Sequence, residues 1–255
     1  NAKAYALVAL GRMRRYQATG DIRHWPHAET CLEWLLNNPS PNCSGLAWGY
    51  PFDVKGTGVS TPRNTPIVVV ASIAGEAFML ARTLDKDARW ANAARNIAIF
   101  ILRDIPRLPG LSSQSHCFAY TPGDVRRVHN ANLLAAAHLA RVYAVTHEPE
   151  LLDALLPSVL FALEGQREDG SWPYGECAPN EPFEPALMKI VDHYHTGFVL
   201  RSLNEIADVA EQTDALDAPR LREAVRQGFA YYERSLLLPD GTPVAAHGKF
   251  PVEIH

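Results

Sequence analysis

The stretch Asn130-Ala131-Asn132-Leu133-Leu134-Ala135-Ala136 decides the fold, because it opens a helical pattern that is apolar on nearly every side. A helix without a polar face must be enclosed by protein. Two other segments align with this stretch without gaps, residues 65–71 and residues 195–201. Their starts are evenly spaced along the chain at 65, 130 and 195. The even spacing predicts a repeated unit with one inner helix in each copy.

Each inner helix has an amphipathic helix as its partner. Residues 90–101 and 221–232 place apolar side chains at helical spacing between charged ones. The other two pairs are residues 4–17 with 28–36 and residues 133–145 with 151–163. We therefore predict four helical hairpins, each with one enclosed and one half-exposed member, and no convincing strand of alternating period. The fold class is all-α.

A closed array of such hairpins is an α/α toroid, with parallel inner helices around an axis and antiparallel outer helices. Six hairpins of about 65 residues would need more than the 255 residues present. The sequence thus predicts an incomplete (α/α)6 barrel-like toroid. We expect residues 1–255 to form a single domain, and truncation at its C-terminus is one of the alternatives.

Composition excludes several classes of protein. Hydrophobic residues make up 47% of the chain, which is ample for a packed core and excludes disorder. The formal net charge of −4 shows no excess of basic residues that would bind nucleic acid or an anionic membrane, so we expect no nucleic-acid partner. The longest apolar run, within residues 67–80, is broken by Gly75 and Glu76 and is too short to span a bilayer.

The remaining sequence signals concern cofactors and compartment. The spacing of the four cysteines fits neither a CxxC metal site nor a dense disulfide framework, and no cofactor motif is present, so we expect no cofactor. The chain opens at Asn1 without a charged and apolar leader. This favours the cytoplasm without establishing it, and the oligomeric state is left open.

The connections between hairpins are long, whereas those within hairpins are short. The long ones span residues 45–64, 111–129, 170–191 and 239–255. Because each enters the N-terminus of an inner helix, all four are predicted at the same end of the toroid. Long loops in compact domains are often functional.

Three of these connections place aromatic side chains a few residues before a carboxylate. Aromatic rings stack on the apolar faces of sugars, and neighbouring carboxylates hydrogen-bond sugar hydroxyls. This pattern predicts a saccharide site, and the alternative is that the rings only pack the rim. The residues are Trp48 and Tyr50 before Asp53, Tyr120 before Asp124, and Trp172 and Tyr174 before Glu176.

The densest polar stretch is Asp192-His193-Tyr194-His195, and it is our first choice for catalysis. Asp192 could orient a histidine that acts as a general base or acid. The alternative is a helix cap with two hydrogen-bonded histidines. A metal site would need His193 or His195 with Glu253 and His255, but no compact ligand pattern supports it, so we expect no metal.

Inner-helix N-termini that share one basin also provide positive potential, which favours an anionic saccharide as the ligand. The catalytic candidates are His195, His193, Asp192, Asp53, Asp124, Glu176 and Tyr194. The candidates for substrate binding are Trp48, Tyr50, Tyr120, Arg126, Arg127, Asn130, Trp172, Tyr174 and His255.

Residues 166–172, Gln-Arg-Glu-Asp-Gly-Ser-Trp, resemble the glutamine-tryptophan repeat motif of the squalene cyclase and prenyltransferase toroids. In those proteins the motif is structural and joins an outer helix to the next loop. The acidic clusters that start carbocation chemistry there, Asp-x-Asp-Asp or Asp-Asp-x-x-Asp, are absent from this sequence. The resemblance therefore implies a toroid and argues against terpenoid cyclisation.

A broader resemblance runs through residues 48–53, 166–176, 194–203 and 250–255. Together they look like the toroidal polysaccharide-biosynthesis proteins of bacterial exopolysaccharide clusters. Those proteins are similar in outline to six-hairpin glycosidases, polysaccharide lyases and the helical domain of glucuronyl epimerases. The resemblance implies an α/α toroid in a carbohydrate context and assigns no catalytic residue.

Three functions compete on these grounds. The leading hypothesis is an enzyme that acts on an acidic polysaccharide or oligosaccharide by hydrolysis, β-elimination or epimerisation. The alternatives are a non-catalytic module for saccharide binding or assembly, and a terpenoid-handling toroid. A basin that holds two acids, or an acid beside a histidine, would favour the enzyme.

Overall fold

The computed structural model describes residues 1–56, 59–177 and 185–244. In this part of the chain the long helices form four antiparallel hairpins, which confirms the predicted α/α toroid architecture. The hairpins are α1 (Ala2–Thr19) with α2 (His24–Asn37), α3 (Val68–Leu84) with α4 (Ala88–Asp104), α5 (His129–Thr146) with α6 (Pro149–Glu164), and α8 (His193–Thr213) with α9 (Ala218–Ser235).

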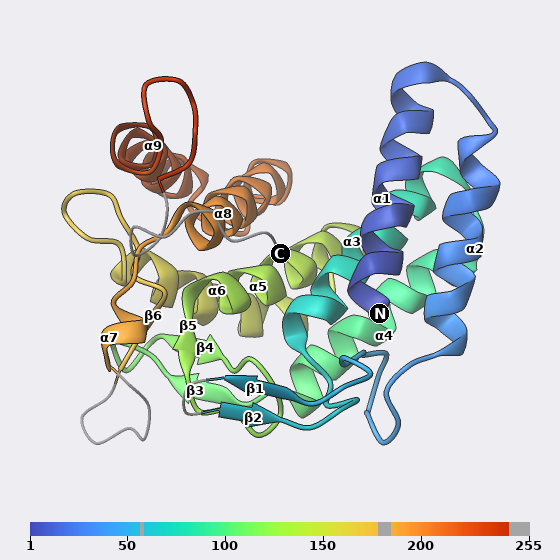
Figure 1. Cartoon of the computed structure of the whole chain (residues 1–255), viewed down its shortest axis with the longest axis horizontal. Coiled ribbons are helices and arrows are strands. Elements are labelled where there is room, and N and C mark those ends of the chain that lie inside the picture. Colours follow the sequence, from blue (N-terminus) through green and yellow to red (C-terminus); the bar gives the residue numbers. More distant parts are fainter. Residues whose placement is uncertain (57–58, 178–184, 245–255) are drawn as a thin grey trace.

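The first helix of each hairpin is the inner one. α1 packs on α3, α3 on α5 and α5 on α8, so the four inner helices follow one another around an arc. Figure 1 shows this arc, with α1 and α8 at its two ends. Because α3 and α5 have neighbours on both sides, they are buried on almost every face, as their apolar sequences predict.

Short strands in the connections were not predicted. Among the residues that the structure describes, they form three antiparallel two-stranded ladders. Each strand has only two or three residues, too few for an alternating pattern to be visible in the sequence. All three ladders lie in the lower half of Figure 1, where the pair β5 and β6 and the short helix α7 (Pro185–Met188) are at the left. The pairs are β1 (Val54–Gly56) with β2 (Val59–Thr61), β3 (Arg107–Pro109) with β4 (His116–Phe118), and β5 (Arg127–Val128) with β6 (Gly175–Glu176).

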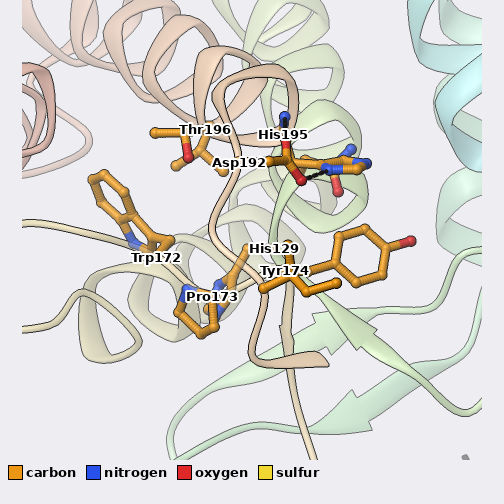
Figure 2. Close-up of a pocket in the computed structure, with 10 residues that line it drawn as sticks. His129, Trp172, Pro173, Tyr174, Asp192, His195 and Thr196 are labelled. Carbon is orange, nitrogen blue, oxygen red and sulfur yellow. Dashed lines mark hydrogen bonds and ion pairs between the residues drawn. The ribbon is translucent and has the colours of Figure 1, made fainter. Parts of the chain in front are cut away.

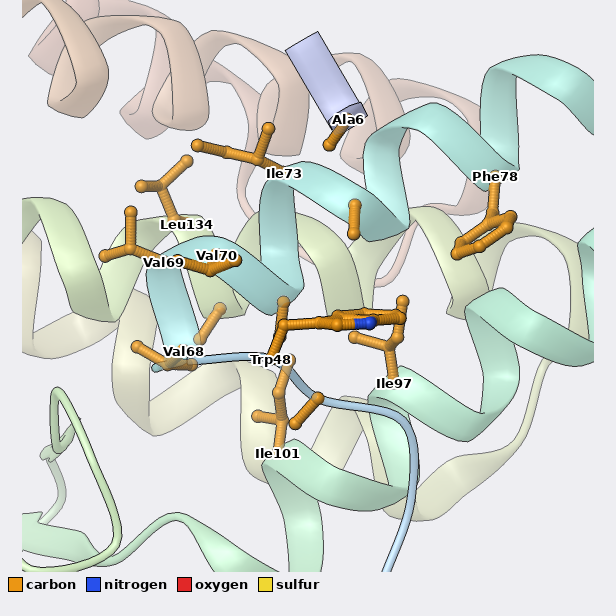
Figure 3. Packing of buried hydrophobic residues seen from close by; sticks show 14 of the residues in the cluster. Ala6, Trp48, Val68, Val69, Val70, Ile73, Phe78, Ile97, Ile101 and Leu134 are labelled. Atoms are coloured by element: carbon orange, nitrogen blue, oxygen red, sulfur yellow. The ribbon is translucent and has the colours of Figure 1, made fainter. Parts of the chain in front are cut away.

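A large part of the core is organised around Trp48, which leaves the first long connection and inserts between helices. Its side chain is 1% exposed and lies among residues of α3 and α4, including Ile97 and Ile101 (Figure 3). Its ring centroid is 6.4 Å from that of Phe78, and its Nε1 donates to the carbonyl of Leu35 at 3.0 Å. The ring thus fastens the connection to the first two hairpins.

Close approach of α3 and α5 depends on a glycine. A Cβ atom at Gly75 would lie 2.3 Å from the ring of His138 on α5. His138 is fully buried and its Nε2 is 2.9 Å from the carbonyl of Ala94 on α4. The absence of a side chain at Gly75 therefore makes room for a histidine that reaches a third helix.

An ion-pair cluster links the inner helices. Glu76 of α3 has a side chain that is 9% exposed, and it pairs with Arg14 of α1 at 2.6 Å. It also pairs with Arg201 of α8, and Arg141 of α5 lies 4.0 Å from it. Arg141 and Arg201 both pair with Glu205 of α8. One member of every hairpin thus contributes to the cluster.

No helix within the described ranges combines the length and the apolar character needed to cross a membrane.

Candidate active site

Three long connections meet at the N-termini of the inner helices through main-chain hydrogen bonds. The carbonyls of Trp48 and Tyr120 accept from the N–H groups of Ile67 and Val68, each at 3.0 Å. The carbonyl of Tyr174 accepts from the N–H of His129 at 3.1 Å. Each carbonyl satisfies a donor that a helix start leaves unpaired. The connections therefore converge over the same end of the toroid.

At the start of α8, Asp192 holds His195 in two ways. Its Oδ1 accepts the backbone N–H of His195 at 2.8 Å and thereby caps the helix. Its Oδ2 lies 2.6 Å from Nδ1 of the same residue (Figure 2). Burial acts to raise the pKa of Asp192, but the hydrogen bond and charge of His195 outweigh it and hold the pKa below its ordinary value. The carboxylate is therefore ionised near neutral pH.

Two tyrosines pack on the His195 ring. The ring of Tyr174 meets it edge to face at a centroid distance of 4.6 Å, and that of Tyr194 does so at 5.2 Å. Figure 2 shows Tyr174 and His195 side by side at a small pocket. The histidine is therefore oriented by a carboxylate and two aromatic rings. The pocket is lined by His129, Asn130, Trp172, Pro173, Tyr174, Ile190, Asp192, His195, Thr196 and Val199.

Tyr120, in the connection of residues 111–129, also lies near the tyrosines around His195. Burial raises the pKa of its phenol far above the ordinary value, and the nearby phenols of Tyr174, Tyr50 and Tyr194 act in the same direction. The hydroxyl thus keeps its proton at any working pH. Four tyrosines, from three connections and the start of α8, therefore lie close enough for their phenols to interact, and we call the place where they gather the basin.

Arg126 lies beside Tyr120, with its guanidinium carbon 5.8 Å from the ring centroid. It donates from Nε and a terminal nitrogen to both oxygens of Asp124, at 2.5 to 3.1 Å. Burial disfavours its charge, but the hydrogen bonds and charge of Asp124 raise the pKa of Arg126 above its usual value. Asp124 is thus committed to an internal ion pair.

His129 was not among the predicted site residues, although it is the first residue of α5. Its buried Nε2 is 3.3 Å from Oε1 of Glu176, and its ring stacks on Phe161 at 4.7 Å. The ladder of β5 with β6 positions Glu176 by pairing it with Arg127. The sequence pattern did not indicate His129, because its partner Glu176 is distant in the sequence. A histidine directly before Asn130, at a predicted helix start, was the available signal.

Asn130 lies next to His129 and also lines the pocket. Its side chain is 4% exposed, and its Oδ1 is buried without a hydrogen-bond partner among the described residues. A buried amide oxygen without a donor is costly, so a hydroxyl group of a ligand would satisfy it.

The structure places two predicted ligand-binding tryptophans in the core. Trp48 has no exposed ring face, and Trp172 is 2% exposed. Trp172 donates from Nε1 to the carbonyl of Ala162 at 2.8 Å and packs so closely on Gly228 that a Cβ atom there would lie 2.3 Å from its ring. Its ring points away from Tyr174 (Figure 2). Both tryptophans therefore pack in the core. They are not available to stack on a sugar, because stacking needs an exposed face of the indole ring.

Two other predicted residues, Asp53 and His193, lie within the described part of the chain but make no hydrogen bond or ring contact with His195. Asp53 is exposed and accepts the backbone N–H of Arg63 at 2.8 Å. His193 starts α8, and its Nδ1 is buried without a partner in the described part of the chain. His255 lies outside the described residues, as does Glu253. Among the residues that are described, no group of three or more potential ligands could hold a metal ion.

Comparison with known proteins identifies the architecture. No family model matches the chain, and no curated protein matches its sequence. Solved structures match it along almost its whole length. The unsaturated glucuronyl hydrolase of Bacillus sp. GL1 has a TM-score of 0.67 at 15% identity, with 96% of this chain and 65% of that chain covered. The fold is that of the six-hairpin glycosidase-like toroids.

Two further structures show the same likeness. Cellobiose 2-epimerase from Spirochaeta thermophila has a TM-score of 0.70 at 13% identity, with coverage of 96% and 64%. An α-mannanase of glycoside hydrolase family 76 from Bacteroides thetaiotaomicron has a TM-score of 0.65 at 12% identity, with coverage of 99% and 61%. The chain spans somewhat less than two thirds of the length of these carbohydrate-active enzymes.

Proposed function

We propose that this chain forms the saccharide-binding and catalytic part of an enzyme that processes an acidic, uronate-containing glycan, in bacterial exopolysaccharide metabolism. The observation that carries the proposal is the contact of Asp192 with His195 at 2.6 Å, inside a basin of tyrosines. A module that only binds sugars has no need of an oriented, carboxylate-paired histidine. Structures of similar fold belong to a hydrolase, a mannanase and an epimerase that act on sugars, which supports a sugar as the substrate.

His195 is suited to act as a general base. An ionised carboxylate only accepts hydrogen bonds, so Nδ1 of His195 carries the proton that faces Asp192. The lone pair is then on Nε2, the other ring nitrogen. Asp192 also stabilises the imidazolium that forms when Nε2 takes a proton.

The state of the carboxylates favours elimination or epimerisation over hydrolysis. Hydrolysis by two carboxyl groups needs one as acid and one as nucleophile or base. Here Asp124 is bound by Arg126, Glu176 faces His129, and Asp192 faces His195. Each of these groups already has a partner, whereas a histidine and several phenols gather at the basin.

The corresponding step is proton transfer at carbon next to the uronate carboxylate. In elimination, Nε2 of His195 takes the proton from C5, a double bond forms between C4 and C5, and the C4–O bond breaks. The leaving oxygen receives a proton from a phenol such as that of Tyr174, which packs on His195. In epimerisation, the C4–O bond stays intact and a proton returns to C5 from the opposite face.

A screen of uronate polymers with three readouts tests the proposal. Reducing ends report cleavage by either route, ultraviolet absorbance of the unsaturated uronate reports elimination, and deuterium uptake at C5 reports epimerisation. We expect His195→Ala to lower turnover by a factor of about 100 or more while the helical circular dichroism is retained. His27→Ala, at an exposed position of α2, is the matched control and should be fully active.

Two results would overturn the proposal. One is a wild-type protein that modifies none of the polymers yet binds them. The other is full activity of the His195→Ala variant, which would remove the histidine from the reaction.

A further inference from the structure

The first hairpin reaches the basin through Lys3, a residue outside every connection in which the sequence placed candidates. Lys3 is half-buried at the start of α1, and its Nζ donates to the hydroxyl of Tyr194 at 3.2 Å. The same nitrogen lies 6.0 Å from the centroid of the Tyr194 ring. Lys3 and Tyr194 are 191 residues apart in the sequence, so this contact joins the first inner helix to the last.

Lys3 is a cation for which the described residues provide no carboxylate partner. The ammonium group has three N–H donors, and Tyr194 accepts one of them. Among the described residues no carboxylate pairs with Lys3, since its contacts are the hydroxyl and ring of Tyr194. Within residues 1–56, 59–177 and 185–244, the ammonium charge is therefore uncompensated in a partly buried place.

Three arginines at or below the basin already have carboxylate partners. Arg126 is bound by Asp124, and Arg14 and Arg201 are bound by Glu76. Positive ends of α1 and α8 add to the potential near Lys3, because both helices begin here. The local imbalance favours an anion at this position.

The position of Lys3 relative to the base defines what that anion would do. Tyr194 contacts Lys3 through its hydroxyl and His195 through its ring. Only the side chain of Tyr194 would therefore separate an anion bound by Lys3 from His195, the proposed general base. A uronate carries its carboxylate on C6, one bond from the C5 that loses its proton.

We infer that Lys3 is the residue that recognises the carboxylate of the glycan, and that it sets the preference for acidic over neutral sugars. This inference rests on the proposed function and adds the specificity-determining residue. It makes the first hairpin part of the substrate site, and the ammonium offsets the charge that builds on the carboxylate as C5 loses its proton.

The test measures preference and not only activity. Binding is titrated for oligosaccharides of glucuronate, galacturonate, mannuronate and guluronate, each alongside its carboxyl-reduced neutral counterpart. The proteins are the wild type, Lys3→Met, Lys3→Arg and, as the matched control, Lys86→Met. Lys86 is exposed in the turn that follows α3, at the opposite end of that helix from the basin.

We expect the wild type and Lys86→Met to prefer an acidic oligosaccharide by about 10- to 100-fold. Lys3→Met should lose this preference while its affinity for the neutral counterpart is unchanged. Lys3→Arg should keep most of the preference, because it keeps the charge. Added salt should lower the affinity of the wild type for the acidic ligand more than that of Lys3→Met.

The outcomes separate this inference from the proposed function. If the wild type prefers acidic ligands and Lys3→Met keeps the preference, the role of Lys3 is wrong and the proposed function stands. An equal loss of acidic and neutral binding in Lys3→Met shows a structural role and also overturns the inference. A wild type without any acidic preference overturns both the inference and the acidic substrate.

Discussion

Arg14 on α1 donates to Oε1 of Glu76 on α3 at 2.6 Å, although the two residues are 62 positions apart. Glu76 also pairs with Arg201 on α8, so one carboxylate joins the first, second and fourth hairpins. Its side chain is nearly buried, whereas the arginines are partly exposed. The carboxylate is therefore the member of the cluster whose loss matters most.

Glu76→Gln should lower the free energy of unfolding by about 2 kcal/mol, because it removes a nearly buried charge that pairs with Arg14 and Arg201, and only Arg201 then keeps a second carboxylate partner, Glu205. Urea unfolding measures the change. Glu150→Gln is the control, since the pair of Glu150 with Arg103 is about half exposed on both sides and should contribute less than about 1 kcal/mol. Equal changes in the free energy of unfolding for the two variants would show that the ion pairs of Glu76 do not stabilise the toroid.

Asp192→Asn separates the two roles of Asp192. Asparagine still caps the start of α8, so we expect the free energy of unfolding to change by less than about 0.5 kcal/mol. The amide no longer holds the charged pair with Nδ1 of His195, so turnover should fall by about 100-fold or more. Steady-state kinetics and urea unfolding give the two readouts.

A second capping aspartate provides the comparison for Asp192→Asn. Asp87 caps α4 by accepting the backbone N–H of Arg89 at 2.8 Å. Asp87→Asn should leave turnover unchanged. If Asp192→Asn is as active as Asp87→Asn, Asp192 only caps α8 and takes no part in catalysis.

Gly75→Ala and Gly11→Ala should have effects of opposite sign. At Gly75 the new Cβ would lie 2.3 Å from the His138 ring, so we expect a loss of about 2 kcal/mol in the free energy of unfolding. At Gly11, an exposed position of α1, nothing lies within 4 Å, and alanine should add about 0.5 to 1 kcal/mol. Thermal unfolding of both variants checks the prediction, and a tolerated alanine at Gly75 would contradict the close packing of α3 and α5.

Two buried histidines should make the protein less stable in acid. Burial lowers the pKa of His138 to about 3 and that of His116 to about 4, from an ordinary value of 6.5. As the pH falls below 6.5, the unfolded chain takes up protons at these residues that the folded chain refuses. Stability therefore falls down to about pH 4 for His116 and about pH 3 for His138, by up to about 1.4 kcal/mol per pH unit for each histidine.

His138→Gln tests the origin of this pH dependence. The variant should be less stable overall, yet the slope of unfolding free energy between about pH 6 and about pH 4 should drop by about one proton. His27→Gln, at an exposed position, should leave the slope unchanged. Urea titrations across this pH range give the slopes, and an unaltered slope in His138→Gln would refute the assignment.

Local pattern predicted the repeat and the polar pair of the candidate site. The even spacing of residues 65, 130 and 195 places three inner helices, because helices enclosed by protein must be apolar all round. The contact of Asp192 with His195 also follows from local rules, since a capping residue lies beside the third residue of its own helix. The short strands in the connections escaped prediction because two or three residues carry no period.

The sequence by itself thus determined the toroid of helical hairpins and the end at which its long connections gather. Only the tertiary structure decided which aromatic rings turn inward as packing, as Trp48 and Trp172 do, and which surround the basin, as Tyr120 and Tyr174 do. It alone placed Lys3 against Tyr194. Side chains in connections follow no helical or strand period, so their directions depend on contacts with hairpins that are distant in the sequence.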